Sequence, residues 1–302
     1  MSSPLLARSG LSLDRLASFV AIADAGGLSA AARGDAVRQS QLSRQLKELE
    51  EFFGTALIER RRGVFRLTTD GRMLLEVARG ALTRLEDFER HCAGQLTEVH
   101  LGAGESVLVW LLMPRLGLLL ASEAKVAFTL HNLQSDEIVT RLRDGRLDFG
   151  ILRRADVGAG LESVALGRVS YALFVPESAL VRGPREPLRR LLARLPLAVL
   201  EGGGAVHETL AAWAAGHGVT LNIRLRCTSL VQAAAAVGQL GMAAVLPTWA
   251  ASAFAPGQVI QVRLSFLSSL EAPLRLVWSK RQLGVRPFLE GVAKELGRIL
   301  AR

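Results

Sequence analysis

The chain has 302 residues, a length that predicts two or three domains, each with its own core. Hydrophobic residues make up 50% of it and charged residues 22%, a composition that excludes disordered and fibrous proteins. Its two cysteines, Cys92 and Cys227, are too few for a disulfide framework and form no CxxC pair, so we expect a reducing, cytoplasmic environment.

The apolar segments are too short or too interrupted to cross a membrane. Val107–Ala121 falls short of the roughly 20 apolar residues that a membrane helix needs, and a Pro-Arg pair interrupts it. Leu16–Ala23 has the length of a signal-peptide core, but aspartates flank it on both sides. We therefore predict neither a secretory signal nor a membrane partner.

The net charge favours an anionic partner but does not locate it. The formal charge is +9, from 37 basic and 28 acidic residues, and such an excess suits nucleic acid or another anion. Residues 1–95 hold 14 basic and 12 acidic side chains, which leaves 23 and 16 for the remainder. An argument for DNA binding must therefore rest on where particular side chains lie.

The first 35 residues predict two short helices. Apolar residues at helical spacing begin at Leu13 and end at Ala23, and Gly26-Gly27 then stops the first helix. The second helix, over Leu28–Ala32, contains consecutive alanines whose small side chains allow close helix contact. Gly34-Asp35 ends it.

A third helix, over Gln39–Phe53, is the most informative segment. Its apolar residues fall on one narrow stripe that must face a core. A separate face of hydrogen-bond donors lies near the helix start, where a recognition helix contacts base edges and phosphates. An ordinary solvated face is the alternative. The apolar stripe comprises Leu42, Leu46, Leu49 and Phe53, and the polar face comprises Gln39, Ser40, Ser43, Arg44 and Lys47.

Gly54 breaks this helix, and residues 57–68 predict two short strands around a basic turn, which is the pattern of a wing. Three consecutive arginines, Arg60, Arg61 and Arg62, stand at the turn. Arginines at such a tip reach phosphates, or a minor groove whose negative potential attracts them. A charge run alone is more typical of a solvated surface, so the preceding helix carries the DNA-binding interpretation.

Together these segments resemble the winged helix-turn-helix of LysR-type transcriptional regulators. The resemblance implies that Gln39, Ser40, Ser43 and Arg44 contact DNA and that the wing arginines hold the flanking backbone. Arg38, Gln41 and Lys47 complete the predicted DNA-binding surface. The chain departs from the family at Asp35, Arg38 and Ser40, which replace a usual leucine, a small capping residue and a common proline. The residues that carry the resemblance are Ala31-Ala32, Gln39–Leu46, Leu49-Glu50, Gly54, Leu57, Arg60 and Leu67-Thr68.

From Thr68 or Thr69 a long helix is predicted to about His91. Its apolar residues repeat at alternating spacings of four and three, the pattern of a heptad seam. A helix packed on its own domain shows a similar stripe, but the resemblance implies a linker helix that pairs two subunits in a homodimer or homotetramer. The predicted seam comprises Leu74, Ala78, Ala81, Leu85, Phe88 and Cys92.

After Gly94 strands and helices alternate, which predicts an α/β fold with a largely parallel sheet. The strand-helix-strand pattern runs over 99–152 and restarts over 197–247, so we expect two similar lobes, with 274–278 and the closing helix 288–300 returning to the first. The predicted organisation is a winged helix-turn-helix (1–68), a linker helix (69–95) and a two-lobed α/β domain (96–302), with lobe I over 96–165 and 268–302 and lobe II over 166–267.

This half also resembles the family's effector domain, which has the fold of periplasmic binding proteins, through Gly145–Ile151 and Gly241–Pro247. The resemblance implies a small-molecule effector between the lobes, and helix N-termini there favour anionic ones. Ordinary capped turns are the alternative at each position. Leu133 replaces a usual glycine, so the effector's identity does not carry over. The predicted contacts are Gly104, Glu105, Ser106, Gln134, Ser135, Gly202, Gly203, Gly204, Ala205, Thr228 and Ser229.

Two enzyme-like motifs lack their context. Asp148-Phe149-Gly150 spells a kinase triplet without the glycine-rich loop, paired lysine and catalytic loop of a kinase. His207-Glu208 lacks the second histidine of a zinc protease, since the matching position is Ala211. We expect no catalytic residue, metal or cofactor. The sequence predicts an effector-responsive DNA-binding regulator, with RNA polymerase as a further candidate partner; the alternative is a solute-binding or enzymatic α/β protein with an N-terminal interaction module.

Overall fold

The computed structural model describes residues 10–59, 65–121, 125–180, 187–202 and 204–301. These divide into two compact units, one made of residues 1–97 with 284–286 and the other of residues 98–283 with 287–302. In the described ranges, no helix is both long enough and apolar enough to span a membrane.

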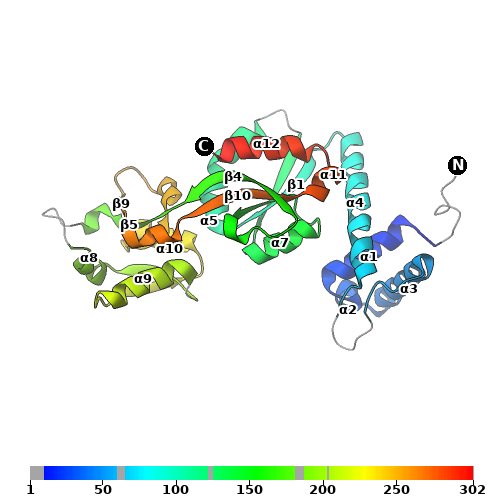
Figure 1. Cartoon of the computed structure of the whole chain (residues 1–302), viewed down its shortest axis with the longest axis horizontal. Helices are drawn as coiled ribbons and strands as arrows, with labels where there is room; N and C mark the ends of the chain where they lie inside the picture. The colour runs from blue at the N-terminus through cyan, green and yellow to red at the C-terminus, as the bar shows by residue number, and fades with distance from the viewer. Residues whose placement is uncertain (1–9, 60–64, 122–124, 181–186, 203, 302) are drawn as a thin grey trace. The chain divides into compact units, whose positions relative to one another are not determined.

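The described part of residues 1–97 is mostly helical (Figure 1), and several of its helix ends follow local capping rules. Ser12 Oγ accepts the N–H of Arg15 at 3.3 Å, and Thr68 Oγ1 accepts the N–H of Gly71 at 2.9 Å. Gly26 ends the first helix at φ 73°, a left-handed conformation that suits glycine. The helices are α1 (Leu13–Ala25), α2 (Leu28–Ala32), α3 (Ala36–Phe53) and α4 (Thr69–Cys92).

Helix α3 begins at Ala36, earlier than the predicted start at Gln39. Asp35 is the reason, because its Oδ1 accepts the N–H groups of Val37 at 2.9 Å and Arg38 at 3.1 Å. Those backbone donors would otherwise have no partner within the helix. The aspartate that departs from the family pattern is thus the N-cap of the third helix.

The apolar stripe of α3 is confirmed at its first three positions and wrong at its last. Leu42, Leu46 and Leu49 are buried in the core that α1, α2 and α4 share. Phe53, however, is 38% exposed, and Phe52 is buried in its place. Phe52, three residues after Leu49, is the residue that faces the core at this end of the helix. The Phe53 ring packs edge-on against the Phe52 ring, with their centroids 5.0 Å apart.

A five-stranded sheet in the order β2-β1-β3-β10-β4 forms the centre of the second unit (Figure 1). Strands β1 and β3 are parallel, with Leu101 opposite Phe149, but β10 runs antiparallel to both β3 and β4. The expectation of parallel strands is confirmed for the pairing of β1 with β3 and wrong for β10, because the chain returns from its second lobe through β10 in the reverse direction. The strands are β1 (Thr97–Ala103), β2 (Val126–Asn132), β3 (Phe149–Arg153), β4 (Leu161–Val169) and β10 (Ala272–Ser279).

The apolar segment Val107–Ala121, which a Pro-Arg pair interrupts, is helical as far as Leu120 and includes a π-helical turn over Leu108–Leu112. Pro114 follows two residues after this turn, near the start of α6, where its missing N–H removes no hydrogen bond within that helix. The helices of this part are α5 (Glu105–Val107), the π-helix η1 (Leu108–Leu112), α6 (Met113–Leu120), α7 (Ser135–Arg143), the 3-10 turn η2 (Arg154–Asp156), α11 (Lys280–Val285) and α12 (Leu289–Leu300).

Glycines let α7 lie directly on the sheet. A Cβ on Gly102 would stand 3.3 Å from Ile138 Cγ1 of α7, and a Cβ on Gly150 would stand 2.5 Å from Ile138 Cγ2. Both distances are too short for a side chain to be accommodated without movement. This close approach places the start of α7 beside the carboxyl ends of β1 and β3.

The strands of lobe II form an antiparallel group, β8-β5-β9, and a parallel pair, β6-β7. A bridge between Leu197 and Ala243 joins the two groups. The strands are β5 (Tyr171–Pro176), β6 (Leu197–Leu200), β7 (Ile223–Cys227), β8 (Ala244–Pro247) and β9 (Val259–Val262); the helices are α8 (Leu188–Arg194), α9 (Gly204–Gly216) and α10 (Leu230–Leu240), with 3-10 turns η3 (Glu177–Ala179), η4 (Thr248–Ala253) and η5 (Ser265–Leu270).

Candidate DNA-binding surface and effector cavity

The polar face of α3 is open to solvent along the first half of the helix. Arg44 keeps 73% of its side chain exposed, and its Nε lies 4.0 Å from Glu48, too far for a strong ion pair. The guanidinium is therefore available to a ligand. Every predicted contact of this helix is exposed: Arg38, Gln39, Ser40, Gln41, Ser43, Arg44 and Lys47.

Polar contacts hold α3 in place on its inner side. Arg15 of α1 donates to Glu48 at 2.8 Å, and Ser18 Oγ donates to Gln45 Oε1 at 2.6 Å. Glu50 accepts the N–H of Leu57 at 2.8 Å, which ties the helix to the segment that follows it. These contacts orient the outer face, as a rigid recognition element requires, and on that face Lys47 Nζ lies 3.5 Å from Glu51 Oε1 in an exposed ion pair.

The base of the predicted wing is present as an antiparallel bridge between Ile58 and Leu67. The N–H of Glu59 donates to the Arg66 carbonyl at 2.9 Å, and the N–H of Thr68 donates to the Leu57 carbonyl at 3.1 Å. The predicted tip residues Arg60, Arg61 and Arg62 lie outside the described residues.

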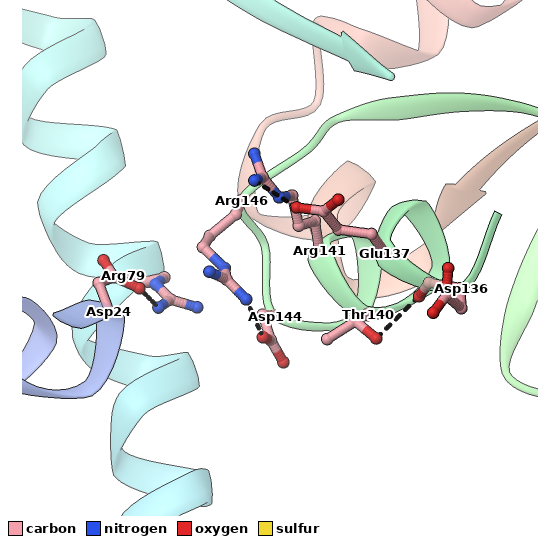
Figure 2. Close-up of polar contacts among 8 residues, drawn as sticks. All are labelled: Asp24, Arg79, Asp136, Glu137, Thr140, Arg141, Asp144 and Arg146. Carbon is pink, nitrogen blue, oxygen red and sulfur yellow. Dashed lines mark hydrogen bonds and ion pairs between the residues drawn. The ribbon is translucent and has the colours of Figure 1, made fainter. Parts of the chain in front are cut away.

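The predicted seam of α4 divides between two environments. Leu74 packs against the core that α4 shares with α1, α2 and α3, and Ala78 is fully buried, so this half of the stripe is not free for a partner. Arg79 pairs with Asp24 of α1 and helps to hold the two helices together (Figure 2). Leu85 and Phe88 are exposed, and Ala81 is half-buried.

Two exposed apolar residues on α4, Met73 and Val77, were absent from the predicted seam. They line an open groove of about 260 Å³ with Phe53 and Leu57. A helical spacing of four separates Met73, Val77, Ala81 and Leu85. This spacing is visible in the sequence and could have indicated that Met73 and Val77 belong to the stripe. The exposed apolar stripe of α4 thus begins one residue before the predicted one.

A cavity of about 150 Å³ lies at the carboxyl ends of the strands in the second unit. Its size is comparable to an engineered protein cavity of about 150 Å³ that holds benzene. Four of the predicted effector contacts line it: Gly104, Ser106, Gln134 and Ser135.

The other predicted contacts do not line this cavity. Thr228 and Ser229 instead cap α10, since Ser229 Oγ accepts the N–H of Gln232 at 3.3 Å and Thr228 donates to the Gln232 side chain. Their polar groups are thereby satisfied within the turn, as in the alternative of ordinary capped turns. Glu105, Gly202, Gly204 and Ala205 are also absent from the lining, and Gly203 lies outside the described residues.

The charged and aromatic groups of the cavity come from segments far apart in the sequence, which the sequence analysis missed. Arg153, at the end of β3, donates to the Tyr171 hydroxyl at 2.8 Å. Asp156 accepts the Ser135 hydroxyl at 3.0 Å. Trp249 also lines the cavity, and its Nε1 is buried without a hydrogen-bond partner among the described residues. No short motif links these positions, so only the fold brings them together.

The residues of the two enzyme-like motifs lie in structural positions. Asp148 is buried, and its carboxylate accepts the N–H of His100 at 2.8 Å and the Gln282 amide at 3.0 Å. His207 lies on α9 beside a small cavity of apolar residues. Among the described residues, no cluster of three histidine, cysteine or acidic side chains is placed to hold a metal.

Two family models match the chain. Residues 13–72 match the bacterial regulatory helix-turn-helix protein of the lysR family, and residues 93–296 match the LysR substrate binding domain. The chain belongs to the LysR family. Within this family, a probable hydrogen peroxide-inducible genes activator of Mycobacterium leprae is 32% identical over 198 residues, 64% of this chain. The matched region spans 63% of that relative's length.

Solved structures of LysR-family regulators share the fold. A full-length OxyR variant from Pseudomonas aeruginosa superposes with a TM-score of 0.61 at 20% identity, covering 97% of this chain and 96% of that one. Full-length CbnR in complex with its target DNA superposes with a TM-score of 0.53 at 23% identity, covering 94% of this chain and 99% of that one. At these identities the likeness shows the fold alone.

Proposed function

We propose that the protein is a transcriptional regulator whose winged helix-turn-helix reads an operator in duplex DNA. The observation that carries this proposal is the exposed donor face of α3, held rigidly from behind, in a chain of the LysR family. CbnR, which has the same fold, is complexed with its target DNA. Arg44, Gln39 and Ser43 are then the groups that contact base edges, and the wing arginines contact the backbone.

The second unit is proposed to sense a small anionic effector. The cavity offers one cationic side chain, Arg153, and the N-terminus of α7, where Gln134 makes no side-chain cap. A carboxylate binds both kinds of group well. Asp156 stands in the same lining and disfavours a second negative charge, so a small monocarboxylate fits best.

Peroxide sensing, suggested by the name of the Mycobacterium leprae relative, finds little support in the thiols of this chain. Burial raises the pKa of the Cys227 thiol, which keeps it protonated and poorly reactive at neutral pH. Cys92 is exposed on α4, in the other unit. A small-molecule effector therefore accounts for the second unit better than a thiol-based peroxide sensor does.

The remaining features of the proposal follow from this function. The protein acts as a homo-oligomer in the cytoplasm, with α4 joining subunits, and it regulates transcription without catalysing a reaction. RNA polymerase is its further candidate partner. The domain limits are those expected from the sequence: 1–68 for DNA binding, 69–95 for the linker and 96–302 for effector binding.

Two experiments test the proposal. Selection from a random duplex library should yield one sequence that full-length protein binds well above random DNA, with a strong salt dependence. A thermal-shift screen of small carboxylates should yield a compound that raises the melting temperature, because a ligand that binds only the native state stabilises it. If the selection at low salt yielded no preferred sequence, the proposed DNA-binding function would be contradicted. If only the thermal-shift screen yielded no ligand, the proposed class of effector alone would be contradicted.

A further inference from the structure

The positive charge of the chain is concentrated far along the sequence from its DNA-reading helix. Residues 166–267 hold nine arginines and four glutamates, with no lysine and no aspartate. This third of the chain supplies more than half of the net charge of +9, whereas residues 1–95 supply little of it. A net charge of this size is compatible with solubility alone, so its meaning depends on where the arginines lie on the lobe.

Five of the seven described arginines of this lobe lie on two adjoining elements, whereas Arg168 lies on β4 and Arg263 directly follows β9. Arg224 and Arg226 alternate with inward-facing residues along β7, so both project from its outer face. The Asn222 side chain donates to the carbonyl of Arg194 at 3.3 Å, which places the end of α8 beside the start of β7. We call the following exposed set the lobe II arginine surface: Arg189, Arg190, Arg194, Arg224 and Arg226.

Few acids compensate this surface. Arg189, Arg190, Arg224 and Arg226 form no ion pair with any residue in the described ranges of the chain. Some arginines of lobe I do have acidic partners: Figure 2 shows Arg141 paired with Glu137 at 2.6 Å and Arg146 paired with Asp144 at 2.9 Å. Repulsion among unpaired like charges is unfavourable, so their grouping on lobe II favours an anionic partner.

We propose that the lobe II arginine surface is a second DNA-contacting surface, which binds the phosphate backbone without reading sequence. Duplex DNA carries one charge per about 1.7 Å of axis, and guanidinium groups bind phosphate through paired hydrogen bonds. A regulator already held on its operator meets neighbouring DNA at high effective concentration, so a weak backbone surface suffices. This inference rests on the proposed DNA-binding function and extends it to the effector domain.

The test compares full-length wild type with Arg224→Gln/Arg226→Gln and with Arg154→Gln/Arg298→Gln. The control pair removes the same charge from exposed positions of lobe I. Binding to a random 60-bp duplex, and to the selected operator in a duplex of that length, is measured between about 50 and 200 mM salt. We expect the lobe II variant to lower the slope of log affinity against log salt by about one to two and to weaken both duplexes roughly tenfold, while the control stays near wild type.

Several outcomes would overturn the inference. An unchanged slope and affinity for the lobe II variant would show that the surface does not touch DNA. Equal losses in both variants would show a general charge effect. Unchanged DNA binding with reduced transcription in a purified system would assign the surface to an acidic protein instead. The preference for the operator over random DNA is assigned to α3. A wild-type protein that bound the operator no better than random DNA would therefore contradict the proposed function, not the role of the lobe II arginine surface. Circular dichroism and Arg189→Gln/Arg190→Gln, an independent pair on α8, guard against a folding defect.

Discussion

Ala78 and Leu85 lie two turns apart on the predicted seam of α4, yet Ala78 is fully buried and Leu85 is 47% exposed. The same stripe therefore serves two purposes along its length. Its first half packs α4 onto α1, and its second half presents apolar side chains to solvent. Exposed apolar residues in a row are unfavourable in a monomer, so they indicate a contact with another chain.

Leu85→Glu is expected to reduce the dimer fraction and operator affinity while leaving each subunit folded. The substitution would place two acids in an apolar contact, which costs several kcal/mol unless the helices separate. Sedimentation equilibrium measures the association, and circular dichroism checks the fold. Arg84→Glu, at the exposed neighbouring position, is the control and should stay associated. A folded Leu85→Glu protein as dimeric as wild type would remove the linker helix from the interface.

Asp35→Ala is expected to lower the free energy of unfolding of the N-terminal unit by about 1 kcal/mol, because two N–H groups at the start of α3 lose their acceptor. Thermal denaturation monitored at 222 nm measures the loss. Asp35→Asn keeps an acceptor oxygen and should be close to wild type. Equal destabilisation by both substitutions would mean that the charge, rather than the cap, stabilises this helix.

Arg153→Gln is expected to abolish the stabilisation produced by the best small carboxylate of the thermal-shift screen. The substitution removes the cationic side chain of the cavity while keeping a donor for the Tyr171 hydroxyl. The measurement is the rise in melting temperature against ligand concentration. Arg154→Gln changes the exposed neighbour that does not line the cavity and should retain the full shift. Equal responses of both variants would place the carboxylate elsewhere.

A histidine pair on neighbouring strands predicts a loss of stability in mild acid. His131 Nε2 lies 3.1 Å from His100 Nδ1. Burial, His100 and Arg141 lower the pKa of His131 below its ordinary 6.5, against the opposing effect of Glu98. The folded state thus favours neutral His131. Below pH 6.5 the unfolded chain takes up the proton first, so stability falls until the pH passes the lowered pKa.

His131→Gln should reduce this loss between pH 7.5 and pH 5.5, as measured by the urea midpoint at each pH. His91→Gln, at an exposed position on α4, is the matched control and should leave the loss as it is in wild type. If the two variants lose stability equally over this range, protonation of His131 does not cause the effect.

Local signals in the sequence located the elements that carry caps or strong periodicity. Helix α10 is an example, because Ser229 caps its start and Gly241 ends it with φ 67°, and both residues are typical of helix ends. Strands β4, β5 and β9 were missed, since their pairing is antiparallel and long-range, which the strand-helix alternation does not reveal. Adjacent phenylalanines made the last buried position of α3 ambiguous, because both lie near the edge of the stripe.

The two candidate sites differ in how far the sequence could predict them. The donor face of α3 lies on one continuous helix, so its residues follow from periodicity alone. The cavity draws Arg153, Tyr171 and Trp249 from three separate segments, and their proximity depends on the antiparallel return of the chain. A side chain that contributes through tertiary contact leaves no local pattern in the sequence.

The most direct test of the DNA-reading helix is the ratio of operator affinity to random-duplex affinity for Arg44→Ala, measured by fluorescence anisotropy at one fixed salt concentration. A lost base contact should reduce this discrimination by about 1 to 3 kcal/mol, while the melting temperature stays near that of wild type. Arg84→Ala, which removes an exposed arginine from α4, controls for the change in charge and should keep the wild-type ratio. An Arg44→Ala protein that retained the wild-type ratio would contradict the assignment of α3 as the recognition helix.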